Sequence, residues 1–186
     1  MVKASLKGKR KKWFGVKAKN PYKGVDLGEI LAYEIKNIIG RKLTVNYSQI
    51  ANNSKDQKTK VKFEITETKG EDGLAEPIGM FVQDSFIGQR IKRDSTRNIL
   101  VFNCKSKDKK DIKIKAIYSS KNKISKSVNA RILKNLQELF TEFVGSIESN
   151  KLFDIEFMKK KTYELKKKSN NVYPIDKLYL WKLSII

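Results

Sequence analysis

The sequence predicts an α+β fold made of an antiparallel β-sheet, flanking helices and a basic N-terminal arm. Three observations support this. Apolar and polar residues alternate along 43–47, 60–66 and 112–116, as they do in half-buried antiparallel strands. Apolar residues recur every four positions along 127–145, as they do on the buried face of a helix. Lysine and arginine crowd residues 1–12, and like charges at this density do not fold on their own.

The predicted arm ends in an aromatic pair, Trp13-Phe14, which we expect to anchor it to the body of the protein. Such an arm either orders on RNA or serves as a solubilising tail. We therefore divide the chain into an arm at 1–14 and a single domain at 15–186. The basic residues of the arm are Lys3, Lys7, Lys9, Arg10, Lys11 and Lys12.

Residues 26–40 are predicted to form a helix after a turn-rich stretch at 15–25. Asp26 and Glu29 have the spacing of a capping box. Gly40 is placed to end the helix. The apolar residues that follow the capping box at helical spacing are Leu27, Leu31, Ile35 and Ile38.

The strand predictions continue beyond this segment. Strands at 43–47 and 60–66 flank a polar loop at 52–58, and a turn follows at 69–73. An apolar run at 99–104 and the alternation at 112–116 predict a hairpin with a long charged tip. Core positions are predicted for Phe81, Phe86, Ile87, Tyr47, Phe63, Phe102, Tyr179, Trp181 and the single cysteine, Cys104.

The C-terminal third is predicted to contain two helices and a strand. The 127–145 helix has the clearest pattern, and residues 151–168 form a shorter helix that Asn170-Asn171 ends. Residues 172–186 then form a strand that returns to the sheet.

Charge is the strongest functional signal. The chain has 41 Lys and Arg against 20 Asp and Glu, a formal net charge of +21. Such a surplus repels itself in a compact fold unless a polyanion neutralises it, and nucleic acid is the commonest such partner. The excess of lysine over arginine favours recognition of backbone and shape over base reading. An AT-rich genome, which inflates lysine, asparagine and isoleucine counts, is the alternative explanation.

The residue inventory argues against catalysis. With one cysteine and no histidine, an internal disulfide, a Cys-rich zinc site and the Ser-His and Cys-His nucleophile pairs are excluded. A Gly-rich phosphate loop is absent from the sequence. We therefore expect no enzyme activity, no cofactor and no metal. We also expect a reducing, cytosol-like compartment and no membrane span.

Two groups of cations are the sharpest candidates for RNA binding, since arginine forks onto phosphate and helix N-termini add to phosphate affinity. An ordinary solvated surface is the alternative for each, and we prefer it for a third group, Lys159–Lys161. The first group is Arg90, Lys92, Arg93 and Arg97. The second, which opens the long helix, is Lys121, Lys123, Lys126 and Arg131.

Several short motifs follow one another along the chain: Lys11-Lys12-Trp13, Ile39-Gly40-Arg41, Lys60-Val61-Lys62-Phe63 with Lys69-Gly70, and Tyr173-Pro174 with Leu178. In this order they resemble the archaeal and eukaryotic small-subunit ribosomal protein family called S-three-Ae, or eukaryotic-type S-one. The resemblance covers about residues 11–186. Where the family has a tight Asp-Gly turn, this chain has Lys107-Asp108-Lys109-Lys110.

The resemblance implies a barrel-like, partly closed sheet flanked by helices. It also implies a structural role on the platform of the small ribosomal subunit in the cytoplasm, near the messenger exit. Arg41, which lies in one of these motifs, joins the expected RNA-binding set. The arm contributes Lys7, Lys9, Arg10, Lys11, Lys12 and Trp13 to this set through its charge and its aromatic end. The implied partners are small-subunit ribosomal RNA and neighbouring ribosomal proteins, with messenger RNA and initiation factors as further candidates. A non-ribosomal RNA binder, an adaptor for an acidic protein and an RNA-modifying enzyme remain as rivals.

Overall fold

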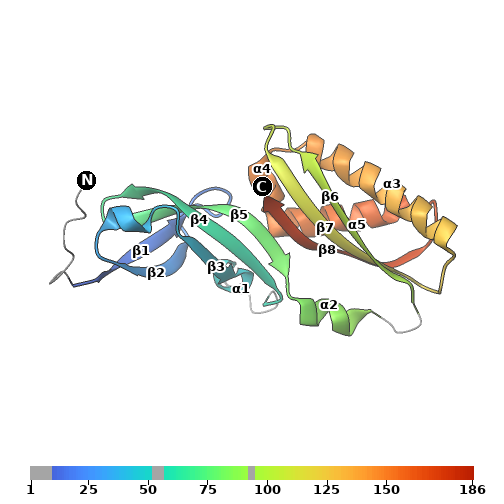
Figure 1. Cartoon of the computed structure of the whole chain (residues 1–186), viewed down its shortest axis with the longest axis horizontal. Coiled ribbons are helices and arrows are strands. Elements are labelled where there is room, and N and C mark those ends of the chain that lie inside the picture. The colour runs from blue at the N-terminus through green and yellow to red at the C-terminus, as the bar shows by residue number, and fades with distance from the viewer. Residues whose placement is uncertain (1–9, 52–56, 92–94) are drawn as a thin grey trace, which may run out of the picture.

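The computed structural model describes residues 10–51, 57–91 and 95–186, and it has the α+β class that the sequence predicts. Its elongated shape has β1–β5 in one half and β6–β8 with α3–α5 in the other (Figure 1). In chain order the elements are β1 (Lys12–Ala18), β2 (Asp26–Ala32), the 3-10 helix η1 (Ile35–Ile38), β3 (Lys42–Asn46), α1 (Tyr47–Ile50), β4 (Thr59–Lys69), β5 (Asp72–Val82), α2 (Asp84–Arg90), β6 (Arg97–Lys105), β7 (Asp111–Ser120), α3 (Lys126–Gly145), α4 (Ser149–Leu152), α5 (Ile155–Ser169) and β8 (Ile175–Ile185).

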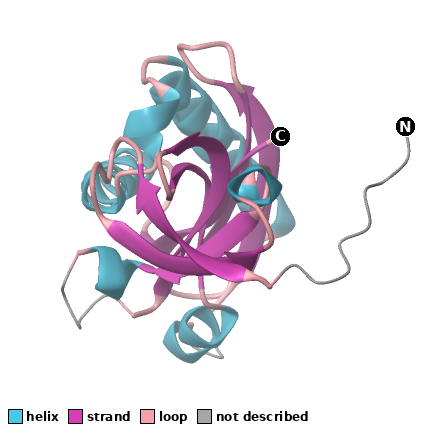
Figure 2. Cartoon of the chain, turned by 90° about the vertical axis from the view of Figure 1, so that its left-hand side faces the viewer, coloured by secondary structure: helices cyan, strands magenta, loops and turns pink. Residues whose placement is uncertain are grey.

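Eight strands of the described part form one sheet whose main path runs β2-β1-β5-β8-β7-β6, with β3 and β4 attached at the other edge of β5. All described pairings are antiparallel except β1 with β5, so the sheet is mixed. The path ends at β2 and β6, and within the described residues the sheet does not close into a barrel. Seen end-on, the strands curve strongly and the helices lie outside the curve (Figure 2).

Strand β5 joins the two halves of the sheet. Its first residues pair with β1, for example Gly73 with Val16, and its last residues pair with β8, for example Phe81 with Lys182. Strand β4 runs along the whole opposite edge of β5. The sequence pattern predicts only a turn and scattered core residues in this region, so this central strand was not predicted.

The predicted helix at 26–40 is wrong. Residues 26–32 form β2, which pairs antiparallel with β1, and only Ile35–Ile38 make a short 3-10 turn. The Asp26 carboxylate accepts a hydrogen bond from the Gly28 amide at 2.9 Å instead of capping a helix. Gly28 has a φ of +109°, which no α-helix contains. Tertiary pairing with β1 therefore outweighed the helical spacing of the apolar residues.

The predictions for the second half are confirmed. β6 and β7 form a hairpin, α3 and α5 match the two predicted helices, and β8 returns to the sheet beside β7. One face of the hairpin carries Leu100, Phe102 and Cys104, all buried under α3. Four residues of α3 are buried on that side: Ile132, Leu136, Phe140 and Val144.

The core predictions hold with a few corrections. Phe63, Phe102, Ile87 and Tyr47 are buried, although Tyr47 begins α1 and is not the end of a strand. The side chains that are only half-buried are Phe81, Phe86, Tyr179 and Trp181. Phe81 pairs with Lys182 of β8, whereas Phe86 and Tyr179 line a hollow that also contains side chains of α5.

The start of β1 bears on the predicted arm. The strand begins at Lys12, so the predicted anchor residues are strand residues. Phe14 packs against the core, whereas Trp13 is 65% exposed. Lys7, Lys9 and the rest of 1–9 lie outside the described residues, so the arm stays a prediction.

Candidate nucleic-acid-binding surface

The base of the β6–β7 hairpin brings together cations from the two predicted groups. Arg97 begins β6 and pairs with Ser119 of β7. The Ile124 amide donates to the Thr96 hydroxyl at 3.0 Å, and the Ser120 amide donates to the Thr96 carbonyl at 3.1 Å. These bonds hold the loop between β7 and α3 beside the start of β6. We call the four exposed cations there the hairpin-base cluster: Arg97, Lys121, Lys123 and Lys126.

Helix α3 is fixed to the hairpin at this same end. The Ser125 hydroxyl caps the helix by accepting from the Val128 amide at 3.4 Å. The Asn129 side-chain oxygen accepts from the Asn98 amide group at 2.6 Å and from the Tyr118 hydroxyl. Arg131 lies one turn further along, on the exposed side of α3. The cluster therefore rests on a rigid support, although within the described residues its four cations form no ion pair with a carboxylate.

Arg90 approaches this end of the sheet from α2. Its guanidinium lies 5.0 Å from the Phe86 ring centroid, and its carbonyl accepts from the Lys177 ammonium. Lys177 pairs with Ser119, which also pairs with Arg97, so Lys177 is a further cation of this surface that was not predicted from the sequence. Lys92 and Arg93 lie outside the described residues.

The remaining predicted residues lie in the other half of the molecule. Arg10, Lys11 and Lys12 are exposed at the start of β1, with the Lys11 ammonium 5.3 Å from the Tyr33 ring centroid. The Arg41 guanidinium donates to the Leu31 carbonyl at 2.9 Å. Arg41 is thus a link to β2 as well as an exposed cation.

A further set of cations was not foreseen. Alternation along β4, β7 and β8 puts five lysines on the open face of the sheet, opposite the face that α3 and α5 cover. A single strand pattern shows only that such residues are solvent-facing; the cross-strand register that gathers them is not visible in sequence. We call them the sheet-face lysines: Lys60, Lys62, Lys113, Lys115 and Lys182.

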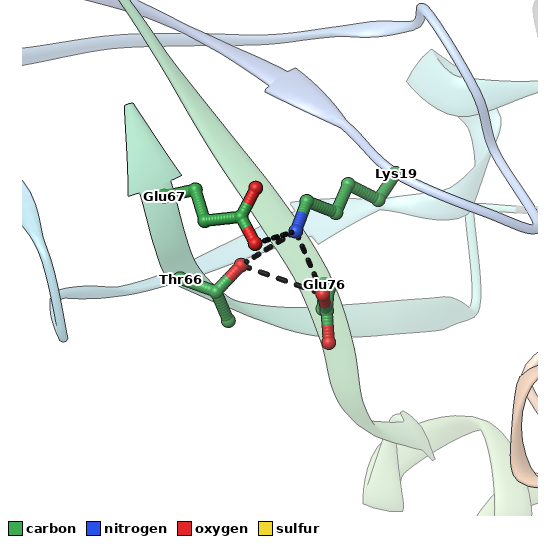
Figure 3. Close-up of polar contacts among 4 residues, drawn as sticks. All are labelled: Lys19, Thr66, Glu67 and Glu76. Atoms are coloured by element: carbon green, nitrogen blue, oxygen red, sulfur yellow. Dashed lines mark hydrogen bonds and ion pairs between the residues drawn. The ribbon is translucent and has the colours of Figure 1, made fainter. Parts of the chain in front are cut away.

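By contrast, the lysines at the end of β1 are neutralised. The Lys19 ammonium lies 3.0 Å from Glu67 and 2.9 Å from Glu76, and it donates to the Thr66 hydroxyl at 3.1 Å (Figure 3). The hydrogen bond to Glu76 raises the pKa of Lys19 above its ordinary value. Lys17 is likewise paired with Asp72. This corner of the protein ties β1 to β4 and β5 and offers little free positive charge.

Among the described residues, no group of three or more His, Cys, Asp and Glu side chains comes together that could hold a metal ion. Cys104 is buried, and burial raises its thiol pKa to about 11, so the nucleophilic thiolate is disfavoured at neutral pH. Among the described helices, none is long and apolar enough to cross a membrane.

Fold and surface together define a basic α+β protein whose exposed cations lie on a packed support and, among the described residues, largely lack acidic partners. A family model described as the Ribosomal S3Ae family matches residues 3–186, and the chain belongs to this family. The resemblance drawn from the motifs is thereby confirmed.

Three archaeal relatives, each named small ribosomal subunit protein eS1, are similar to the chain at modest identity over most of its length. The protein from Nanoarchaeum equitans is 25% identical over 166 residues, which covers 89% of this chain and 84% of the relative. The one from Methanothrix thermoacetophila is 24% identical over 181 residues, covering 97% and 85%. The one from Saccharolobus islandicus is 26% identical over 189 residues, covering 97% and 86%.

Proposed function

We propose that this chain is a structural constituent of the small ribosomal subunit that binds ribosomal RNA on the platform near the messenger exit and supports translation. Its partners are the small-subunit RNA and neighbouring ribosomal proteins, with messenger RNA and initiation factors as further candidates. Its location is the cytoplasmic ribosome. The observation that carries the proposal is the match to the Ribosomal S3Ae family over residues 3–186.

The mechanism is neutralisation of phosphate charge by a fixed array of cations. Lysines and arginines displace counterions from folded RNA, and the packed sheet and helices hold those side chains in place. The hairpin-base cluster supports this, because α3 and the Thr96 hydrogen bonds position it before RNA arrives. Outside that cluster, the proposed contacts are Lys7, Lys9, Arg10, Lys11, Lys12, Trp13, Arg41, Arg90, Lys92, Arg93 and Arg131.

The salt dependence of binding follows from this mechanism. If about six phosphates are contacted, the logarithm of the affinity falls with the logarithm of salt concentration with a slope of about −5. An adaptor that recognises an acidic protein through apolar contacts has a weaker dependence. The slope thus separates the RNA-binding role from the adaptor role.

Sedimentation of a cell lysate tests the proposal. The chain should travel with the small subunit through a sucrose gradient at low salt and move to the top after a high-salt wash. Arg90→Glu with Arg97→Glu should abolish crosslinks to ribosomal RNA, whereas the control pair Lys160→Glu with Lys168→Glu on α5 should keep them. A chain that stays at the top of the gradient at low salt contradicts the proposal.

A further inference from the structure

Four of the five sheet-face lysines line a hollow where four strands, in the order β4-β5-β8-β7, lie side by side. Two adjacent cross-strand rows build it. The first row pairs Lys62, Gly79, Ser184 and Lys113. The second row pairs Lys60, Phe81, Lys182 and Lys115. Paired residues of neighbouring strands point to the same face, so all five lysines lie on it, and four of them (Lys62, Lys113, Lys115 and Lys182) line one depression of about 300 Å³.

The depression exists because its centre has small side chains. Gly79 has none, and Ser184 beside it has a short one, so the middle of the first row is lower than its lysine ends. The backbones of β4 and β7 are three strand intervals apart, about 14 Å at about 4.8 Å per interval. The result is a channel with lysine walls that is open to solvent along its length.

The positive charge of this channel is not cancelled by acidic side chains of the described residues. None of the five lysines forms an ion pair with a carboxylate of the described residues. The next carboxylates on β4 and β5, Glu64 and Glu76, are held by Lys42 and Lys19. Cations gathered on one face without acidic partners attract anions from solution.

Aromatic rings accompany the charge. Phe81 is half-buried between Lys60 and Lys182 in the second row. Trp181 is the extra residue of β8 at a register shift, and its ring centroid lies 4.6 Å from the Lys182 ammonium and 5.8 Å from the Lys115 ammonium.

The indole ring has a fixed position at the end of the channel. Its N–H donates to the Asp84 carboxylate at 2.6 Å, which ties β8 to the start of α2. Unpaired bases stack on such rings, whereas the bases of a duplex are already stacked and out of reach.

We propose that this channel binds an unpaired RNA segment, with its phosphates on the sheet-face lysines and a base against Phe81 or Trp181. The inference rests on the proposed RNA-binding function and adds to it a second site. This site lies on the face of the sheet opposite the one that α3 and α5 cover. Lysine supplies point charges to the phosphates without a sequence code, and the rings accept any base.

Trp181 supplies a direct readout of the site. The chain has two tryptophans, so in a Trp13→Phe background the emission of the full-length protein comes from Trp181 alone. Titration with a short oligouridylate should quench this emission.

Two sets of substitutions test the lysines of the channel. The triple substitution Lys62→Gln, Lys113→Gln and Lys182→Gln, called the groove variant, removes three of them. The control combines Lys160→Gln, Lys167→Gln and Lys168→Gln, three exposed lysines on α5, across the sheet from the channel.

The groove variant should lose the quenching. It should also reduce the magnitude of the slope of log affinity against log salt by about 2, because each of the three lost phosphate contacts on a single strand contributes about 0.7. The control should keep both values. Phe81→Leu keeps an apolar side chain but removes the ring. It should weaken binding about tenfold, because this is the usual contribution of one stacked base to affinity. Circular dichroism of each variant shows whether the fold is intact.

An unchanged slope in the groove variant, or binding that leaves Trp181 emission unaltered, overturns the channel site. Either result can occur while the wild-type chain still sediments with the small subunit, in which case the ribosomal role stands and only the channel fails. Conversely, oligouridylate binding by a chain that never joins the subunit supports the channel and contradicts the ribosomal role.

Discussion

Replacing Phe140 with alanine removes the ring that joins α3 to the β6–β7 hairpin. Phe140 is fully buried, and its ring centroid lies 6.0 Å from that of Phe102 at an interplanar angle of 52°. A buried Phe→Ala change costs about 3–5 kcal/mol, because transfer free energy is lost and a cavity remains. For a chain of this size each kcal/mol lowers Tm by about 2–4 °C, so a loss of about 4 kcal/mol lowers it by about 8–16 °C.

Thermal unfolding followed by circular dichroism measures this effect, and Thr141→Ala is the matched control. Thr141 is the next residue of α3, is exposed, and donates its hydroxyl to the Gln137 carbonyl at 2.8 Å. Loss of this exposed hydroxyl in Thr141→Ala should change the free energy of unfolding by no more than about 0.5 kcal/mol. A Phe140→Ala loss below about 1 kcal/mol would falsify the packing of α3 on the hairpin. The salt slope of RNA binding well below Tm should stay at its wild-type value.

Three other outcomes follow from the structure. Cys104 is buried, so it should resist Ellman's reagent in the native protein and react at once in guanidinium. Its thiol pKa of about 11 in the folded protein exceeds the ordinary 9.0, so the stability that the protonated thiol contributes is full below pH 9.0 and is lost as pH rises toward 11. Cys104→Ala should therefore flatten the alkaline decline of the unfolding free energy. Gly73→Ala should destabilise by about 1–3 kcal/mol because its Cβ would lie 2.9 Å from Ile38 Cδ1, whereas Gly88→Ala, in open space on α2, should stabilise by up to about 1 kcal/mol; urea unfolding compares the pair. Lys19→Met should lower Tm at low salt by an amount that shrinks as NaCl increases, because it removes an ion-pair network that salt screens.

The sequence predicted best where the periodic pattern was long and local. Helix α3 has four buried residues at four-residue spacing, and the β6–β7 hairpin has adjacent strands, so both follow from neighbours in the chain. The segment at 26–32 failed because seven residues with mixed spacing fit a helix or a strand equally well. Its pairing with β1 decided the matter, and that contact is not local.

The candidate surface was predicted in part for the same reason. Lys121, Lys123 and Lys126 are close in sequence, so their proximity was visible, and Arg97 joined them through the hairpin register. The sheet-face lysines come from three strands far apart in sequence, and only the order β4-β5-β8-β7 brings them together. Lys62 alone is indistinguishable from any lysine on the solvent side of a strand.

The shared strand β5 has a mechanical consequence. Its 11 residues, at about 3.4 Å each, make a brace about 37 Å long that is hydrogen-bonded to β1 at one end and to β8 at the other. The two ends of the protein cannot slide or swing independently without breaking that backbone pairing. A partner that binds one end of the protein therefore also fixes the position and orientation of the other end, at a distance set by the length of β5.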